Sequence, residues 1–233
     1  MIETAATKRL LERVMEYGIQ PGAAMNEEGA ATGTVFLIED EAAAREGLCD
    51  LVESAGFGTM CFASAEEFIA GWDDSPGCVV LNAQLPGMSG VELQDYLLRR
   101  GIRVPLIFMT AHADVPMVRK VMKAGAVDFL TKPLEKGEIL TAIEQGFAVD
   151  SALRRELREL DAIRTRLNSL TPREREVMYL VTSGLLNKQT ASELNLSEIS
   201  VKLHRRHVLE KMHAESLADL VRMLEKIRSV QPA

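Results

Sequence analysis

The amino-acid sequence predicts an α/β fold, a doubly wound five-stranded parallel sheet, followed by a linker helix and a small all-α helix-turn-helix domain. Five short apolar segments alternate with segments of helical pattern between residues 34 and 147. Strands that alternate with helices favour a parallel sheet covered by helices on both faces. Residues 148–169 are charged and helical in pattern, and residues 170–233 contain only helical patterns and turns.

Composition and charge limit the class of protein. The chain has 233 residues and a net charge of -7, but residues 171–233 hold ten Lys and Arg against eight Asp and Glu. This asymmetry indicates two modules with different partners. No apolar run approaches the roughly 18 residues of a membrane span, and the N-terminus lacks the apolar core of a signal peptide. We therefore expect a cytoplasmic protein.

The three cysteines, Cys49, Cys61 and Cys78, share no metal-ligand spacing and are odd in number. We expect them to be reduced thiols. Residues 1–33 form an N-terminal extension in which residues 5–17 have the pattern of a short amphipathic helix. Pro21 and Gly22 end that helix, and we expect the extension to have no catalytic role.

Each element of the sheet domain has its own local signal. Gly56 ends the first helix, and Ser64 with Glu67 three residues later is a capping pair that begins the second. The expected strands are 34–38, 59–62, 78–81, 104–109 and 126–130. The expected helices are 41–56, 64–72, 89–101, 114–125 and one that opens at 134–147.

The linker helix, residues 148–169, carries a stripe of leucines. Leu153, Leu157, Leu160 and Leu167 fall at spacings of 4, 3 and 7 residues. Two interpretations remain open. The stripe is either a short coiled coil between two copies of the chain or the apolar side of a solvated linker helix.

Capping and turn residues divide residues 170–233 into helices. Thr171 caps a helix with Pro172 in its first turn and Glu174 completing a capping box. The later signals are Gly184 as a helix end, Asn187 as a start, Asn195 as a turn residue, and Ser197 and Ser216 as caps. A helix, a tight turn and a second helix with basic residues predict a helix-turn-helix.

Several phrases together carry a family resemblance. They are "LPGMSGVELQ", "FMTAHADVPM", "MKAGAVDFLTKP", "LTPREREV" and "NKQTASEL". Residues 34–147 resemble the receiver domain of two-component response regulators, and residues 170–226 resemble the LuxR-type DNA-binding domain. The chain as a whole is similar to FixJ/NarL-type response regulators and is closest to the FixJ branch.

The resemblance assigns roles to residues at the ends of the expected strands. Glu39 and Asp40 match the acidic pair that holds Mg²⁺, a hard cation that favours oxygen ligands. Thr110 matches the hydroxyl that bonds a phosphoryl oxygen, and Lys132 matches the ammonium that pairs with it. Phe129 matches the aromatic switch residue, and the peptide bond after Lys132 matches one that is typically cis in the family.

Asn82 stands where the family carries its phosphoacceptor aspartate. It would complete a metal site with Glu39 and Asp40, but an amide oxygen is a poor nucleophile and brings no negative charge. We therefore expect no phosphorylation and weakened Mg²⁺ binding. Two explanations stay open: a deliberate replacement of aspartate, or a natural protein that has abandoned phosphorylation and uses its receiver for docking and dimerisation.

The second helix of the helix-turn-helix is the expected recognition helix in the major groove. Its polar positions are Ser200, Lys202, His204, Arg205, Arg206 and Lys211. Lys188, in the first turn of the preceding helix, is expected to bind a phosphate. Two residues depart from the family pattern: Thr190 replaces an aliphatic residue, and Ile199 replaces a polar one and is expected to alter sequence preference.

These features predict a transcriptional response regulator that is not an enzyme. The expected partners are double-stranded promoter DNA, a sensor histidine kinase and a second copy of the chain, with no membrane. The alternative is a phosphorylation-independent protein-interaction module that sequesters a kinase or a partner regulator. The basic recognition helix argues for DNA binding.

Overall fold

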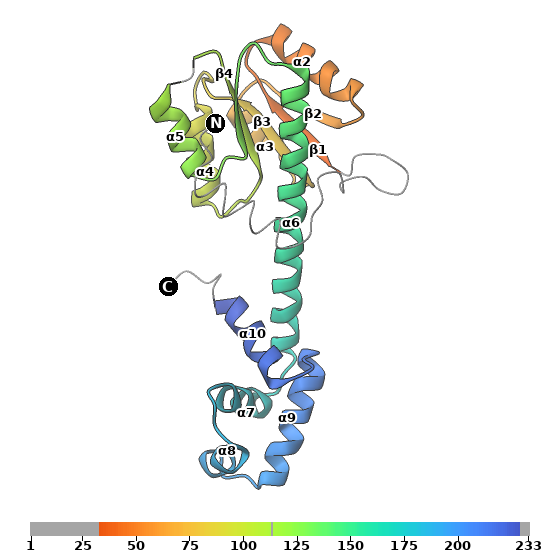
Figure 1. Ribbon diagram of the computed structural model, residues 1–233, viewed down its shortest axis with the longest axis vertical. Coiled ribbons are helices and arrows are strands. Elements are labelled where there is room, and N and C mark those ends of the chain that lie inside the picture. Colours follow the sequence, from red (N-terminus) through yellow and green to blue (C-terminus); the bar gives the residue numbers. More distant parts are fainter. Residues whose placement is uncertain (1–32, 113, 229–233) are drawn as a thin grey trace. The chain divides into compact units, whose positions relative to one another are not determined.

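The computed structural model describes residues 33–112 and 114–228 (Figure 1). The expected N-terminal helix at residues 5–17 lies outside the described residues. The chain divides into two compact units, with the boundary between Arg154 and Arg155.

The first unit contains the expected five-stranded parallel sheet (Figure 1). Its strands are β1 (Thr34–Ile38), β2 (Gly58–Phe62), β3 (Gly77–Asn82), β4 (Leu106–Thr110) and β5 (Asp128–Thr131). They are arranged in the order β2-β1-β3-β4-β5, and every pair is parallel. The order reverses between β1 and β3, which is the place where α/β sheets of this kind bind ligands.

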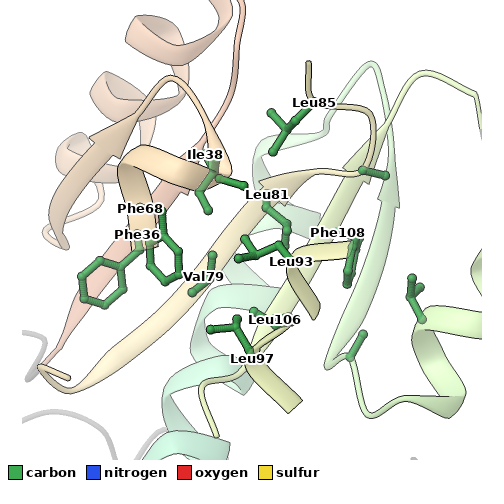
Figure 2. Close-up of a cluster of buried hydrophobic side chains, with 14 residues drawn as sticks. Phe36, Ile38, Phe68, Val79, Leu81, Leu85, Leu93, Leu97, Leu106 and Phe108 are labelled. Atoms are coloured by element: carbon green, nitrogen blue, oxygen red, sulfur yellow. The ribbon is translucent and has the colours of Figure 1, made fainter. Parts of the chain in front are cut away.

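Helices cover both faces of this sheet. They are α2 (Ala42–Ser54), α3 (Ala65–Gly71), α4 (Gly90–Arg99), α5 (Val115–Lys123) and the first part of α6 (Lys136–Asn168). Helices α3, α4 and α5 pack on one face, where the side chains of Phe68 and Leu93 lie among those of Phe36, Val79 and Leu81 (Figure 2). Helices α2 and α6 pack on the other face. Alternate residues of each strand supply the two cores, because successive side chains of a strand point to opposite faces.

Local signals in the sequence begin the helices where expected. Ser64 accepts a hydrogen bond from the backbone of Glu67 at the start of α3. Ser89 and Glu92 form a reciprocal capping box at the start of α4. Such caps satisfy backbone N–H groups that have no partner within the helix.

The expectation of three reduced thiols is wrong for two of them. Cys49 of α2 and Cys61 of β2 are joined in a disulfide, because α2 packs beside β2 and brings the two side chains together. Cys78 is a free, buried cysteine, and burial together with the charge of Asp150 raises the pKa of its thiol. The spacing of twelve residues between Cys49 and Cys61 carried no signal of this pairing.

A buried carboxylate attaches α6 to the amino end of β3. Asp150 is 3% exposed and accepts hydrogen bonds from the backbone N–H of Gly77 at 3.1 Å and from Nε of Arg154 at 2.9 Å. Burial raises the pKa of Asp150, although the hydrogen bonds and charge of Arg154 act in the opposite direction. The last turn of α6 that belongs to the first unit is therefore held by a charge-assisted contact.

The second unit is all-helical, as expected. It consists of the rest of α6 with α7 (Pro172–Thr182), α8 (Asn187–Glu193), α9 (Glu198–Met212) and α10 (Leu217–Arg228). Thr171 and Glu174 form the expected capping box, and Asn195 has a positive φ of 52° in the turn between α8 and α9. That turn gives the helix-turn-helix arrangement.

The leucine stripe of α6 does not lie on one free surface. Leu160 is only 3% exposed and packs with Met178, Val208 and Leu224 in the core of the second unit. Leu167 is partly buried against the same core, whereas Leu157 is 49% exposed. Packing within the chain therefore accounts for Leu160 and Leu167. A contact between two copies could use only Leu153 and Leu157. None of the helices formed by the described residues is long and apolar enough to cross a membrane.

Candidate functional sites

The polar residues expected in the receiver unit lie at the carboxyl edge of its sheet. Glu39 and Asp40 directly follow β1, Asn82 is the last residue of β3, and Thr110 is the last residue of β4. Lys132 follows β5, and its backbone N–H donates to the carbonyl of Thr110 at 2.7 Å. The carboxyl ends of parallel strands meet at one edge, so residues far apart in the chain become neighbours.

The side-chain amide of Asn82 donates to both acidic residues. Its Nδ2 lies 3.3 Å from Oε1 of Glu39 and 3.0 Å from Oδ1 of Asp40. Its Oδ1 accepts from the backbone N–H of Gln84 at 3.1 Å, which fixes the orientation of the amide. The amide N–H groups of Asn82 therefore stabilise the two carboxylates by hydrogen bonding, without adding a charge of their own.

Lys132 completes this network from the other side. Its Nζ lies 2.6 Å from Oε2 of Glu39, a carboxylate whose side chain is only 2% exposed. The peptide bond between Lys132 and Pro133 is cis, as the resemblance implied. Arg45, which the sequence did not indicate, donates to the backbone carbonyls of Glu39 and Asp40 and holds the loop that carries them.

The side chains of Thr110 and Phe129 take no part in this network, and Thr110 contacts it through its backbone carbonyl, which accepts from Lys132. The hydroxyl of Thr110 is buried and exchanges hydrogen bonds with the backbone of His112, at 3.2 and 3.3 Å. The ring of Phe129 is half-buried and stacks on Phe108, with 6.5 Å between ring centroids.

The oxygen donors at this edge are two carboxylates, and the ammonium of Lys132 offsets part of their charge. Glu39 and Asp40 supply carboxylate oxygens, which fit Mg²⁺, while Asn82 supplies a neutral amide. Among the described residues, no group of three His, Cys, Asp or Glu side chains could hold a metal ion. The site also offers no carboxylate at position 82 that could attack phosphorus.

The second candidate site is the exposed face of α9. Lys202 and Arg206 are exposed there, one turn apart. Arg206 pairs with Glu210 at 2.7 Å across one helical turn, and Ser200 is hydrogen-bonded to the Ser197 cap at 2.9 Å. Within residues 33–112 and 114–228, Lys202 forms no ion pair, so its charge is available to a ligand.

Other residues predicted for DNA binding are engaged inside the unit. Arg205 is hydrogen-bonded to the side chain of Asn187, the first residue of α8, and so links the two helices of the motif. His204 is half-buried, and its Nδ1 is buried with no hydrogen-bond partner among the described residues. Lys188 is exposed in the first turn of α8.

Lys211 is paired with Glu174, at 2.7 Å between Nζ and Oε2. Glu174 is 4% exposed, also forms the capping box with Thr171, and lies 3.8 Å from Nδ1 of His207. Burial opposes ionisation of Glu174, but the hydrogen bonds from Lys211 and Thr171 outweigh it and lower the pKa. The Lys211 charge therefore joins α9 to α7, which the sequence pattern alone did not indicate.

Comparison with protein families matches both units. The response regulator receiver domain matches residues 35–144, and the luxR family of bacterial regulatory proteins matches residues 168–224. Nodulation protein W of Bradyrhizobium diazoefficiens is 43% identical over 201 residues, which cover 86% of this chain and 88% of that protein. The transcriptional regulatory protein FixJ of Rhizobium meliloti is 41% identical over 191 residues, covering 82% of this chain and 94% of that one.

A similar arrangement is found among solved structures. The response regulator StyR gives a TM-score of 0.73 at 43% identity and covers 84% of this chain and 100% of its own. Full-length FixJ from B. japonicum gives a TM-score of 0.50 at 36% identity, over 85% of this chain and 98% of its own.

The Glu174 network predicts a pH-dependent stability of the second unit. A lowered pKa means that the carboxylate stabilises the fold above its ordinary pKa of 4.5, and that this contribution is lost as pH falls through the lower folded value. Glu174→Gln should lower the free energy of unfolding by about 1.5–3 kcal/mol at pH 7, and by less at pH 3. Urea denaturation followed by circular dichroism measures the change.

Trp72, the single tryptophan, lies in the first unit, so its fluorescence shows whether that unit is unaffected. Glu176→Gln is the matched control, because Glu176 forms an exposed pair with Arg173 and such pairs contribute about 0–1 kcal/mol. An equal loss in both variants, or a loss that does not shrink with acid, would contradict the role of Glu174.

Proposed function

The chain belongs to the family of two-component response regulators that carry a LuxR-type DNA-binding domain, and from this membership we propose that it regulates transcription by binding double-stranded promoter DNA. Regulators of this type bind DNA and are phosphorylated by sensor kinases. The observation that carries the proposal is the exposed face of α9, where Lys202 and Arg206 project from the second helix of a helix-turn-helix. A protein that acts on chromosomal DNA in this way works in the cytoplasm.

The two basic faces have different tasks in this proposal. Lys202 and Arg206 lie on the helix that enters the major groove, where side chains reach base edges. Lys188 of α8 binds the phosphate backbone, which positions the protein without reading sequence. Ser200, His204 and Arg205 support this surface, and Arg205 does so through its bond to Asn187. Lys211 contributes through its contact with Glu174 rather than as a free cation.

The receiver unit, in our proposal, does not use phosphorylation. Receiver domains generally bind Mg²⁺ for phosphorylation, and the ion when bound spreads the negative charge of the phosphoryl group. Glu39 and Asp40 would hold it here. The Asn82 amide donates to both of these carboxylates and adds no charge, which supports weakened Mg²⁺ binding. Docking of a sensor histidine kinase on this unit then transfers no phosphoryl group to position 82.

We further propose that the chain forms a homodimer through the exposed part of α6. Leu157 is 49% exposed and lies outside the hydrophobic cores of the described residues. A large apolar side chain on a helix surface is a suitable contact between two identical helices. Its neighbour Leu160 is buried within the second unit and is excluded from this contact.

The phosphorylation proposal predicts that the chain with Asn82 takes up no phosphoryl group at that position. After incubation with acetyl phosphate and Mg²⁺, intact-mass analysis should show no adduct on the chain as given and one adduct on Asn82→Asp. The variant gains the nucleophile, while Glu39, Thr110 and Lys132 remain in place. Asn168→Asp, an exposed change at the end of α6, is the control and should gain nothing. An adduct on the unaltered chain, or none on Asn82→Asp, contradicts this role.

The DNA-binding proposal predicts two different effects of charge removal. Lys202→Ala and Arg206→Ala should weaken binding to a selected site by about 1–3 kcal/mol. Lys188→Ala should weaken binding to all duplexes alike and lower the slope of log affinity against log salt by about one. Fluorescence anisotropy with labelled duplexes at several salt concentrations measures both. Lys123→Ala, on the receiver unit, is the control. If the unaltered chain binds no duplex with a salt-dependent affinity, the interaction-module alternative is favoured instead.

The dimer proposal predicts a concentration-dependent association that one charge can disrupt. Leu157→Glu places like charges opposite each other and should shift the chain to monomer in analytical ultracentrifugation, with DNA affinity falling in parallel. Leu98→Glu, at a leucine of similar exposure (51%) on α4, should leave association unchanged. Dissociation by Leu98→Glu alone would place the dimer contact on the receiver unit.

A further inference from the structure

Ile199 of α9 is the most exposed large hydrophobic side chain among the described residues, with 80% of its surface accessible. It belongs to none of the hydrophobic cores of the second unit. The core face of α9 is formed by Val201, Val208 and Met212, which are at most 1% exposed. Ile199 therefore contributes nothing to the packing of α9, and its apolar surface is left to water or to a ligand.

The neighbours of Ile199 on the helix surface define what that ligand would be. Residues at spacings of three, four and seven share one face of a helix, so Ile199 lies on the same face as Lys202, Leu203 and Arg206. Leu203 is also 52% exposed. The face thus combines two cations with an apolar patch, and a polyanion with apolar groups between its charges complements it.

Double-stranded DNA has this combination in its major groove. Phosphates line both edges of the groove, and the C5-methyl group of thymine is the one apolar group that the bases present there. The first turn of a recognition helix lies close to the base edges. Ile199 is the second residue of α9, whereas Lys202 and Arg206 lie further along the same face.

We propose that Ile199 is a specificity-determining residue that packs against the C5-methyl group of a thymine in the bound site. The proposal rests on the DNA-binding function above and deepens it by naming a base and an atom. Ile199 reads an apolar feature that the basic residues of α9 cannot distinguish, because lysine and arginine contact hydrogen-bond acceptors. Burying one group of methyl size changes affinity by about fourfold.

Deoxyuridine tests the contact, because it differs from thymidine only in lacking the methyl group. The full-length protein first selects its site from a random duplex pool, and each thymine of the recovered duplex is then replaced singly by deoxyuridine. For the unaltered chain, replacement of at least one thymine should weaken binding about three- to fivefold. Ile199→Ala should bind the thymine duplex correspondingly more weakly and should lose less than about 1.5-fold on the same replacement.

Two further variants separate this contact from general effects. Ile199→Val keeps a β-branched apolar group and should retain most of the deoxyuridine penalty. Val115→Ala removes a similarly exposed side chain (78%) from the receiver unit and should retain all of it. Circular dichroism shows whether each variant keeps its helices.

The outcomes distinguish this inference from the proposed function. If the protein selects a duplex but the deoxyuridine penalties are the same in Ile199→Ala and in the unaltered chain, the thymine contact is overturned while DNA binding stands. The thymine contact is likewise overturned if no single deoxyuridine replacement weakens binding of the unaltered chain to its selected site. If no duplex is selected, DNA binding itself fails, and the apolar face of α9 is then a protein contact.

Discussion

The receiver unit depends on one geometric constraint, the parallel alignment of its five strands. Because every strand runs in the same direction, β1, β3, β4 and β5 all end at one edge, and each ends in or just before a polar residue. The contacts of Asn82 with Glu39 and Asp40, and of Lys132 with Glu39, follow from that alignment. The apolar parts of the strands are buried between two helical layers, so the polar groups have no other place to lie.

Within that edge, the amide at position 82 changes the electrostatic balance. A carboxylate there would add repulsion among three acidic groups and would require a cation to relieve it. The amide instead donates to both neighbours and receives a hydrogen bond from Gln84, so the network closes with protein groups alone. The polar groups at the sheet edge thus have hydrogen-bond partners within the protein.

Sequence reasoning succeeded where the determining interactions are local. The alternation of short apolar strands with helices, the caps at Ser64 and Thr171 and the left-handed turn at Asn195 are all set within a few residues. It failed where distant segments meet. The disulfide between Cys49 and Cys61 and the burial of Leu160 depend on which other elements pack against α2 and α6. Periodicity shows that a helix has an apolar side, but not what packs against it.

The same distinction explains the basic residues of α9, which are alike in sequence and differ in task. Lys211 forms an ion pair with the buried Glu174, 37 positions earlier in the chain, and Arg205 donates a hydrogen bond to Asn187. Lys202 and Ile199 are left at the surface because nothing in the unit packs over that face. A count of basic residues therefore overestimates the cationic ligand surface, and the exposed apolar residue among them becomes as informative as the charges.

If position 82 takes no phosphoryl group, as we propose, the receiver unit influences the unit that follows it by another route. A ligand shifts a two-state equilibrium only through its different affinities for the two states, and in the proposed dimer the second copy of the chain would be that ligand. Helix α6 runs without interruption from the receiver core, through the Asp150 contact, to the core around Leu160. Residues of this one helix therefore belong to the hydrophobic cores of both units, and in the proposed dimer the input to the regulator would be its own concentration.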